Sequence, residues 1–271
     1  MKRFRGEGKL VPHSFSPADS VVVVTGGGSG IGRALAVHAG AEGARAVVVV
    51  DRDEGEARAT ADRLTRAATA VFAADVTDGA AIAGIVEHVE EEIGPIDLWC
   101  SNAGVHRGEG LGQPADWEIS VGVHVRAHVH AARYVVPRMV ARGRGTLLVT
   151  ASAAGLLSDV ESAPYAVTKH AAVALAEWLS IRHDDDGIGV SCLAPQGVKT
   201  AMNSARRDGR TGFGTDYLEP DAVAAKTFEA LAAGTFLILP HPEVASYEQR
   251  RAGNRERWLA GMRRLAARVS A

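Results

Sequence analysis

The chain has 271 residues, 46% of them hydrophobic and 23% charged, which is enough for one large α/β domain with a sizeable core. Its formal net charge of −2 gives no overall attraction to nucleic acid or to an anionic membrane. No apolar run reaches the roughly 18 residues of a membrane span, and the basic N-terminus lacks the apolar core of a secretory signal. We therefore expect neither nucleic-acid nor membrane partners.

Residues 1–19 contain prolines and serines without a helical period, which predicts an N-terminal arm. No linker composition follows, so residues 20–271 are expected to form a single domain, with two small domains as the alternative. Cys100 and Cys192 lie in apolar runs. This placement is typical of buried, reduced thiols and predicts a cytoplasmic protein, although one disulfide is the alternative.

Apolar, β-branched runs alternate with longer alanine-rich stretches along the chain. The runs do not alternate with polar residues, which is typical of strands buried on both faces of a parallel sheet. They cover residues 21–24, 47–50, 70–73, 96–100, 145–150, 188–193 and 236–239. Helical segments are expected between them, at residues 33–40, 55–66, 80–92, 115–142, 165–183 and 221–233. This order predicts an α/β, Rossmann-like fold, a doubly wound parallel seven-stranded sheet with helices on both faces.

A glycine-rich loop joins the first expected strand to the first helix. Its residues are Thr25, Gly26, Gly27, Gly28, Ser29, Gly30, Ile31 and Gly32. Glycines permit close approach of the backbone to a phosphate, and the helix N-terminus directs N–H groups at it. The arrangement predicts a dinucleotide site that includes Thr25, Gly26, Ser29, Gly30, Ile31 and Gly32.

Asp51 ends the second expected strand, about 20 residues after the loop, where a carboxylate accepts hydrogen bonds from the adenosine ribose. The same charge repels a 2′-phosphate, which favours NAD over NADP. Arg52 is the opposing feature, since a guanidinium can bind that phosphate. A turn residue at the end of a strand is the non-functional interpretation of Asp51.

Tyr165 and Lys169 are four residues apart and share a helix face. An ammonium near a phenol favours the phenolate, so we expect Lys169 to lower the pKa of Tyr165 toward the range of a general base. Ser152 follows the expected strand at 145–150, at the edge of the sheet where ligands bind, and its hydroxyl could hold a substrate oxygen. Helix capping is the alternative role for Ser152.

Together with Asn102, Ala103 and Gly104, these motifs resemble the short-chain dehydrogenase/reductase family over roughly residues 20–240. The resemblance implies that Asp75 and Val76 flank the adenine and that Asn102, Ala103 and Gly104 support the cofactor. It also implies that Lys169 binds the nicotinamide ribose and Thr200 the carboxamide. The loop of Pro195, Gln196, Gly197 and Val198 would face the nicotinamide. Homodimers or homotetramers are expected on the same ground.

Two positions depart from the family pattern. His124 stands where members usually carry a catalytic asparagine, seven residues after Trp117. We interpret it as a functional substitution in the proton relay toward Lys169, with simple packing or a metal site shared with His128 as alternatives. Gln196 replaces a usual glycine, and it either adds a polar contact or adjusts the turn.

The substrate side is expected in a glycine-containing flap at about residues 200–217, followed by an amphipathic helical segment at 241–271. Met202, Phe213 and Tyr217 could line an apolar pocket. Arg206, Arg207 and Arg210 could meet a substrate carboxylate, although most of them are expected to face solvent. The prediction is an NAD-dependent oxidoreductase for a small-molecule alcohol or carbonyl substrate, with Tyr165 as acid/base, Ser152, Lys169 and His124 as its partners and no metal. An NADPH-dependent acyl-thioester ketoreductase and a non-catalytic dinucleotide sensor or scaffold are the alternatives.

Overall fold

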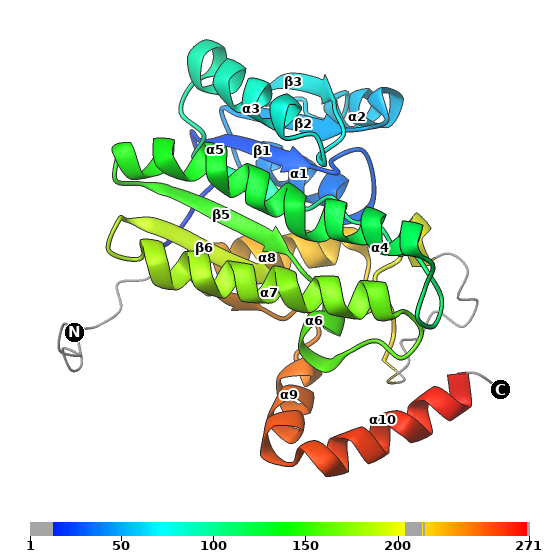
Figure 1. Ribbon diagram of the computed structural model, residues 1–271. Coiled ribbons are helices and arrows are strands. Elements are labelled where there is room, and N and C mark those ends of the chain that lie inside the picture. The colour runs from blue at the N-terminus through cyan, green and yellow to red at the C-terminus, as the bar shows by residue number, and fades with distance from the viewer. Residues whose placement is uncertain (1–12, 204–212, 214, 270–271) are drawn as a thin grey trace.

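The computed structural model of the chain describes residues 13–203, 213 and 215–269. Within them, parallel strands form one sheet in the order β3-β2-β1-β4-β5-β6-β7 (Figure 1). The strand order reverses between β1 and β4, which is the switch point of a doubly wound fold, so the predicted fold class is confirmed. The strands are β1 (Val21–Thr25), β2 (Ala46–Asp51), β3 (Ala68–Ala73), β4 (Leu98–Ser101), β5 (Gly145–Thr150), β6 (Ile188–Leu193) and β7 (Leu237–Ile238).

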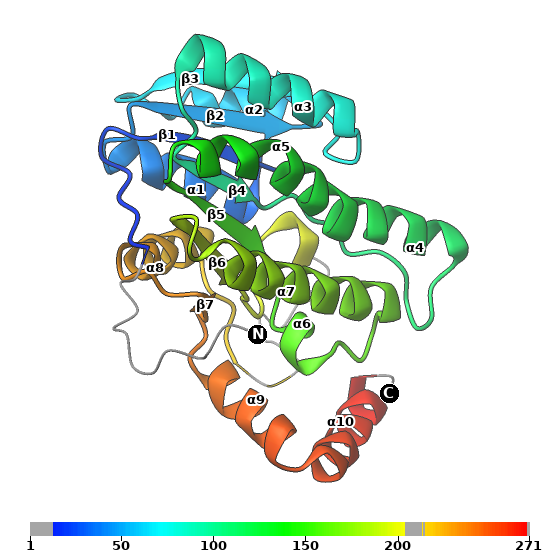
Figure 2. The same cartoon turned by 60° about the vertical axis from the view of Figure 1, so that its left-hand side comes forward.

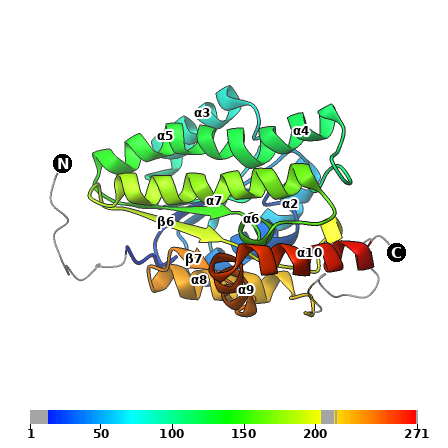
Figure 3. The ribbon, with the colours of Figure 1, turned by 60° about the horizontal axis from the view of Figure 1, so that its bottom comes forward.

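Helices cover both faces of the sheet (Figure 3). One layer consists of α1 (Gly30–Ala41), α2 (Glu54–Ala61) and α8 (Pro220–Ala232). The opposite layer consists of α3 (Gly79–His88), α5 (Ala127–Ala141) and α7 (Ala163–His183). Every residue of β1, β4 and β6 is buried, because each of these strands lies between two helical layers.

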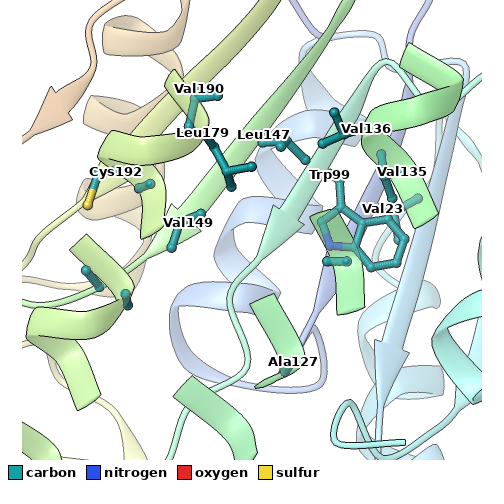
Figure 4. Packing of buried hydrophobic residues seen from close by; sticks show 14 of the residues in the cluster. Val23, Trp99, Ala127, Val135, Val136, Leu147, Val149, Leu179, Val190 and Cys192 are labelled. Carbon is teal, nitrogen blue, oxygen red and sulfur yellow. The ribbon is translucent and has the colours of Figure 1, made fainter. Parts of the chain in front are cut away.

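The core beneath the second layer is built around Trp99 of β4, which is fully buried. Its ring lies among Val23 of β1 and Val135 and Val136 of α5 (Figure 4). Burying so large an apolar side chain contributes on the order of 2–3 kcal/mol to folding. This contact fixes β4, and with it the loop that follows, against α5.

The helix predicted at residues 115–142 has a change of winding in its middle. It begins as α4 (Pro114–Val121), continues through a π-helical turn, η2 (Gly122–Arg126), and goes on as α5. A second π-helical turn, η1 (Val89–Ile93), extends α3. Such wide turns insert an extra residue into the helix and are frequent at functional sites.

Two helical segments end differently from the sequence prediction. The one predicted at 55–66 ends at Ala61, because Leu64 turns inward and packs over Gly40 of α1. The C-terminal segment is two helices, α9 (Glu243–Gly253) and α10 (Arg255–Val269), which lead away from the sheet beyond α6 (Ala154–Leu157) (Figure 2). Among the described residues, no helix is both long and apolar enough to cross a bilayer.

The described part of the predicted N-terminal arm is attached to the domain. Phe15 is buried, and its backbone N–H donates to the carbonyl of Leu231 over 2.9 Å. His13 pairs with Asp184 at 3.1 Å, beyond the end of α7. Residues 1–12 of the predicted arm lie outside the described residues.

Candidate active site

A cleft of about 780 Å³ lies at the carboxyl edge of the sheet, where ligands of doubly wound folds bind. It extends from the glycine loop after β1 to the loop after β6. Most predicted site residues line it: Gly26, Ser29, Gly30, Ile31, Gly32, Asp51, Arg52, Asp75, Val76, Asn102, Ala103, Gly104, Ser152, Tyr165, Lys169, Pro195, Val198 and Thr200. Thr25, His124 and Gly197 are not among the lining residues.

The glycine loop forms a cradle at one end of the cleft. Gly26 has a φ of +63°, and a Cβ there would lie 2.8 Å from the Cα of Ala103. A Cβ on Gly32 would overlap the carbonyl oxygen of Gly26. The Ser29 side chain makes no capping bond at the start of α1, so the first N–H groups of that helix are available to an anion. The cradle therefore fits the pyrophosphate of a dinucleotide.

Thr25 supports this end of the cleft from behind. Its hydroxyl donates to the carbonyl of Cys100 over 3.2 Å and accepts from the backbone N–H of Asn102 over 2.9 Å. The Asn102 amide donates back to the carbonyl of Thr25 over 3.1 Å. These bonds join the loops after β1 and β4, which explains a threonine at this position.

Acidic side chains surround the part of the cleft next to β2. Asp51 Oδ2 accepts from the backbone N–H of Gly28 over 2.9 Å, and its Oδ1 accepts from that of Asp53 over 3.1 Å. Arg33 is engaged by the carboxylate of Glu56. The Asp51 carboxylate is thus held in place at the edge of the cleft.

Asp75 lies in a tight turn that lines the same side of the cleft. Its carboxylate accepts from both the backbone N–H and the hydroxyl of Thr77, over 2.8 and 2.7 Å. These hydrogen bonds hold the pKa of Asp75 below its usual value. A charged, fixed turn follows β3, in the position that sequence resemblance assigns to adenine binding.

Tyr165, Lys169 and Ser152 come together at the other end of the cleft. Ser162 caps α7 by accepting from the backbone N–H of Tyr165 over 3.3 Å. One turn later, the Lys169 Nζ lies 5.8 Å from the centroid of the Tyr165 ring and donates to the carbonyl of Thr150 over 2.9 Å. The Ser152 hydroxyl follows β5 and donates to the carbonyl of Pro195 over 3.4 Å. The structure thus brings the three predicted side chains together in the wall of one cleft.

The charges of this group differ from the sequence prediction. Burial raises the pKa of the Tyr165 phenol to about 12; hydrogen bonding with Ser152 opposes this rise, and the Asp159 carboxylate adds to it. Burial also lowers the pKa of Lys169 to about 8. The predicted lowering of the phenol pKa by Lys169 is therefore wrong, because burial of the phenol raises this pKa and is the largest of its causes.

His124 lies behind Tyr165 in the π-helical turn η2 and is fully buried. Its ring meets the Tyr165 ring edge-on, with centroids 5.6 Å apart. The backbone N–H of Val105 donates to Nε2 over 3.1 Å, so the ring proton is on Nδ1, 2.8 Å from the Thr168 hydroxyl. Burial and the charge of Lys169 hold the pKa of His124 far below its usual value, so the imidazole is neutral.

His128, the other histidine of the metal alternative, has different partners. Its Nδ1 lies 2.6 Å from the hydroxyl of Ser101, and burial lowers its pKa to about 3. In the described part of the chain, no group of three histidine, cysteine or acidic residues is placed to hold a metal ion. The imidazoles of His124 and His128 are engaged by protein groups instead.

Gln196 is held on two sides in the loop after β6. Its backbone N–H donates to His241 Nδ1 over 3.2 Å, and its side-chain oxygen accepts from the Thr215 hydroxyl over 2.7 Å. The side chain thus connects the wall of the cleft to the predicted flap. Met202 lines the cleft, whereas Phe213 and Tyr217 do not. The flap residues Arg206, Arg207, Gly209, Arg210, Gly212 and Gly214 lie outside the described residues.

Two side chains that the sequence prediction did not include, His106 and Asp159, lie near Tyr165. The His106 ring packs on the Tyr165 ring with centroids 4.7 Å apart, and Asp159 lies 3.8 Å from His106. An ionisable residue two positions after the Asn102–Gly104 motif is a signal that could have identified His106. For Asp159 the signal is its place three residues before Ser162, in a turn that precedes α7.

Comparisons with known proteins identify the family of the chain. The profile of the short chain dehydrogenase family matches residues 20–211. The chain is 36% identical over 233 residues to 1-deoxy-11-beta-hydroxypentalenate dehydrogenase of Streptomyces avermitilis, covering 83% of this chain and 85% of that protein. It is 32% identical over 188 residues to meso-2,3-butanediol dehydrogenase of Serratia marcescens, covering 69% and 74%.

A solved structure shares the fold over nearly the whole chain. It is a short chain dehydrogenase/reductase from Burkholderia phymatum in complex with NAD, with a TM-score of 0.81 and 31% sequence identity. The alignment covers 89% of this chain and 96% of that one. The family profile, these relatives and the shared fold lead to one conclusion: the chain belongs to the short-chain dehydrogenase/reductase family of oxidoreductases.

Proposed function

We propose that the protein is an NAD-dependent oxidoreductase that transfers a hydride between nicotinamide and a secondary alcohol or ketone, with Tyr165 as general acid/base. The observation that carries the proposal is the placement of Ser152, Tyr165 and Lys169 in the wall of a cleft whose other end is a pyrophosphate cradle. The two relatives named above are dehydrogenases of hydroxylated compounds.

The glycine loop and Asp51 would hold the dinucleotide, and its nicotinamide, when bound, would supply the carbon that accepts or donates the hydride. The Ser152 hydroxyl holds the substrate oxygen. In oxidation, Tyr165 Oη takes the hydroxyl proton as the hydride leaves the carbinol carbon, and in reduction it returns that proton to the oxygen. Lys169, which donates to the carbonyl of Thr150, would bind the nicotinamide ribose, the role that the sequence resemblance implies.

NAD is the proposed cofactor because of the charges near β2. A 2′-phosphate at the ribose would meet Asp51, whose orientation is fixed by Gly28 and Asp53. Arg33 is committed to Glu56, while Arg52 lines the cleft as the opposing cation. We expect a lower dissociation constant for NADH than for NADPH, measured by nicotinamide fluorescence, and tighter binding of NADPH would refute the assignment.

Turnover is tested with a panel of secondary alcohols and ketones, followed at the nicotinamide absorbance with NAD or NADH. Tyr165→Phe should abolish turnover while NADH affinity stays close to that of the wild type. A fully active variant would remove Tyr165 from the mechanism.

The two alternative functions predict other results in the same assay. An acyl-thioester ketoreductase would require NADPH, and a non-catalytic sensor would bind NADH tightly without turning over any compound.

The same proposal includes self-association as a homodimer or homotetramer. Val167, Trp178 and Ile181 are 53%, 57% and 82% exposed along one side of α7. Large apolar side chains in such a row favour burial against another surface. Light scattering on wild type and on Trp178→Glu tests this self-association; a monomeric wild type would contradict it.

A cytoplasmic location stays a prediction, consistent with free thiols at Cys100 and Cys192.

A further inference from the structure

Arg107 lines the cleft and lies close to Tyr165, because one hydroxyl contacts the main chain of both residues. Ser162 Oγ donates to the carbonyl of Arg107 over 2.9 Å and accepts from the backbone N–H of Tyr165 over 3.3 Å. Arg107 is exposed, so its guanidinium is accessible to a molecule that enters the cleft. We call the part of the cleft that contains Ser152, Tyr165 and Lys169 the Tyr165 end.

Charges are unevenly distributed in the wall of the cleft. The acidic lining residues other than Glu118 belong to β2, α2 and the turns after β2 and β3: Asp51, Asp53, Glu56 and Asp75. Glu118 of α4 is paired with Arg126 at 4.0 Å. Among the described lining residues, none in the loop after β4, in α7 or after β5 and β6 is acidic. The Tyr165 end therefore carries an excess of positive charge, from Arg107 and Lys169.

The guanidinium of Arg107 has no charge partner in the protein. Within the part of the chain that the structure describes, Arg107 forms no ion pair. Two carboxylates of neighbouring segments have other partners. Asp116 accepts from the backbone N–H of Gln113 over 2.9 Å at the start of α4, and Asp159 accepts from two backbone N–H groups of its own turn and faces His106. The Arg107 charge is thus available to a ligand.

The chemistry of this end favours a carboxylate as that ligand group. A guanidinium is planar and forms two parallel hydrogen bonds with a carboxylate. One guanidinium balances the single charge of a carboxylate, whereas a phosphate ester carries about −1.5 to −2 at neutral pH. Lys169 does not supply the second cation, since its buried Nζ donates to the carbonyl of Thr150 over 2.9 Å. Val105 and Met202 add apolar lining for the carbon chain of the same molecule.

We propose that Arg107 is a specificity-determining residue that binds a carboxylate of the substrate, so that the protein acts on hydroxy acids and keto acids. The inference rests on the proposed function, because it places the reacting oxygen at Ser152 and Tyr165. It predicts that a keto acid is a better substrate than its uncharged ester. This preference should depend on Arg107 and should weaken as the salt concentration rises.

The test compares keto acids with their methyl esters. The probes are 4-oxopentanoate, 5-oxohexanoate and 6-oxoheptanoate, in which two, three and four methylene groups separate the ketone from the carboxylate. The readout is the ratio of kcat/KM for an acid to kcat/KM for its ester, with NADH as the reductant. In the wild type this ratio should exceed one for at least one probe, and Arg107→Gln should lower it at least about ten-fold. Arg107→Lys should give an intermediate ratio, because it keeps the charge but not the planar fork.

A matched control is Arg63→Gln, which removes the same charge from an exposed arginine beyond the end of α2 that does not line the cleft. Its ratio should equal that of the wild type. NADH affinity, measured by nicotinamide fluorescence, reports whether each variant is folded. The proposal is overturned if the wild type prefers no acid over its ester, or if Arg107→Gln reduces kcat/KM for acid and ester equally.

Binding of the same probes separates this inference from the proposed function. Each acid and each ester is titrated into the complex with NADH, and the change in nicotinamide fluorescence gives the dissociation constant. Acid binding that Arg107→Gln weakens, in a protein that reduces none of the probes, would support the carboxylate site and contradict the proposed function alone. If no acid binds more tightly than its ester, the assignment of Arg107 is wrong.

Discussion

His124 Nδ1 lies 2.8 Å from the Thr168 hydroxyl, in the turn of α7 that separates Tyr165 from Lys169. Thr168 in turn donates to the carbonyl of Pro164 over 2.6 Å. Because the N–H of Val105 occupies the other ring nitrogen, one neutral tautomer joins the loop after β4 to α7. The geometry favours an orienting role for His124, while the predicted proton relay stays a prediction.

The variant His124→Asn separates these roles. Asparagine can still donate toward Thr168, but it is too short to accept from Val105, so a buried N–H loses its partner. We expect the free energy of unfolding to fall by about 1–3 kcal/mol and kcat to fall, with an unchanged pH profile. Thr168→Ser, which keeps the hydroxyl, should resemble the wild type. A shifted profile would show instead that the imidazole exchanges protons during turnover.

Stability should fall steeply in acid because of His124 and His128. Their folded pKa values lie below the unfolded value, at about 3 for His128, so the unfolded chain binds protons that the folded chain rejects. Above pH 6.5 neither histidine reduces the free energy of unfolding. Below pH 6.5 this stability is progressively lost, because the unfolded chain takes up protons that the folded chain does not. At pH 5 each neutral histidine costs about 2 kcal/mol.

Urea denaturation between pH 7.5 and 5 measures this effect. The slope of the free energy of unfolding against pH reports how many protons the chain takes up when it unfolds. At the acidic end, His128→Gln should lower that number by about one. His88→Gln, on the surface of α3, is the matched control. Equal slopes for wild type and His128→Gln would show that His128 is not buried as a neutral group.

Cofactor choice should change at Asp51. Asp51→Ser removes the carboxylate from the edge of the cleft but keeps a small polar side chain for the Gly28 N–H. We expect the ratio of NADPH to NADH affinity to rise at least about ten-fold, which corresponds to 1.4 kcal/mol. Asp62→Ser removes an exposed carboxylate at the end of α2 and should leave the ratio unaltered. Fluorescence titration of each variant with NADH and with NADPH measures this ratio.

Substrate affinity should depend on the C-terminal helices. Phe213 stacks on Tyr247 of α9 at 5.0 Å and on Trp258 of α10 at 6.2 Å, so these helices hold a residue of the predicted flap. Trp258→Ala should raise KM about two- to ten-fold without changing NADH affinity, in line with the loss of one aromatic contact. Trp258→Phe retains a ring and should behave like the wild type. A changed NADH affinity would point to general unfolding instead.

The strands and the cofactor end of the cleft could be predicted because their signals are local. Runs of buried valine mark β1 and β2, and the glycine loop directly follows β1. The end of α2 at Ala61 could not, since it depends on Leu64 packing over Gly40, a contact with another helix. The break between α9 and α10 does have a local signal, because Gly253 and Asn254 are residue types that commonly end a helix, and the prediction of one segment did not use it.

The candidate site shows the same division. Tyr165, Lys169 and Ser152 belong to a short stretch with fixed spacing, and the cleft contains all three. His106 and Asp159 are far apart in the sequence, and only the bonds between their loops bring them together. The predicted direction of the Tyr165 pKa shift was wrong, because residue spacing reveals a nearby ammonium but not how deeply the phenol is buried.

The π-helical turn η2 lets the continuous helix from α4 to α5 contribute to two different surfaces. Before it, Glu118 and Ile119 of α4 border the cleft; after it, Ala131 and Val135 of α5 pack on the sheet. The extra residue advances the helix by about 100° of rotation, so it re-phases the two halves. Deleting a single residue between Gly122 and Arg126 would turn either the cleft wall or the core face outward. Insertions and deletions in this helix are therefore constrained by angle more than by length.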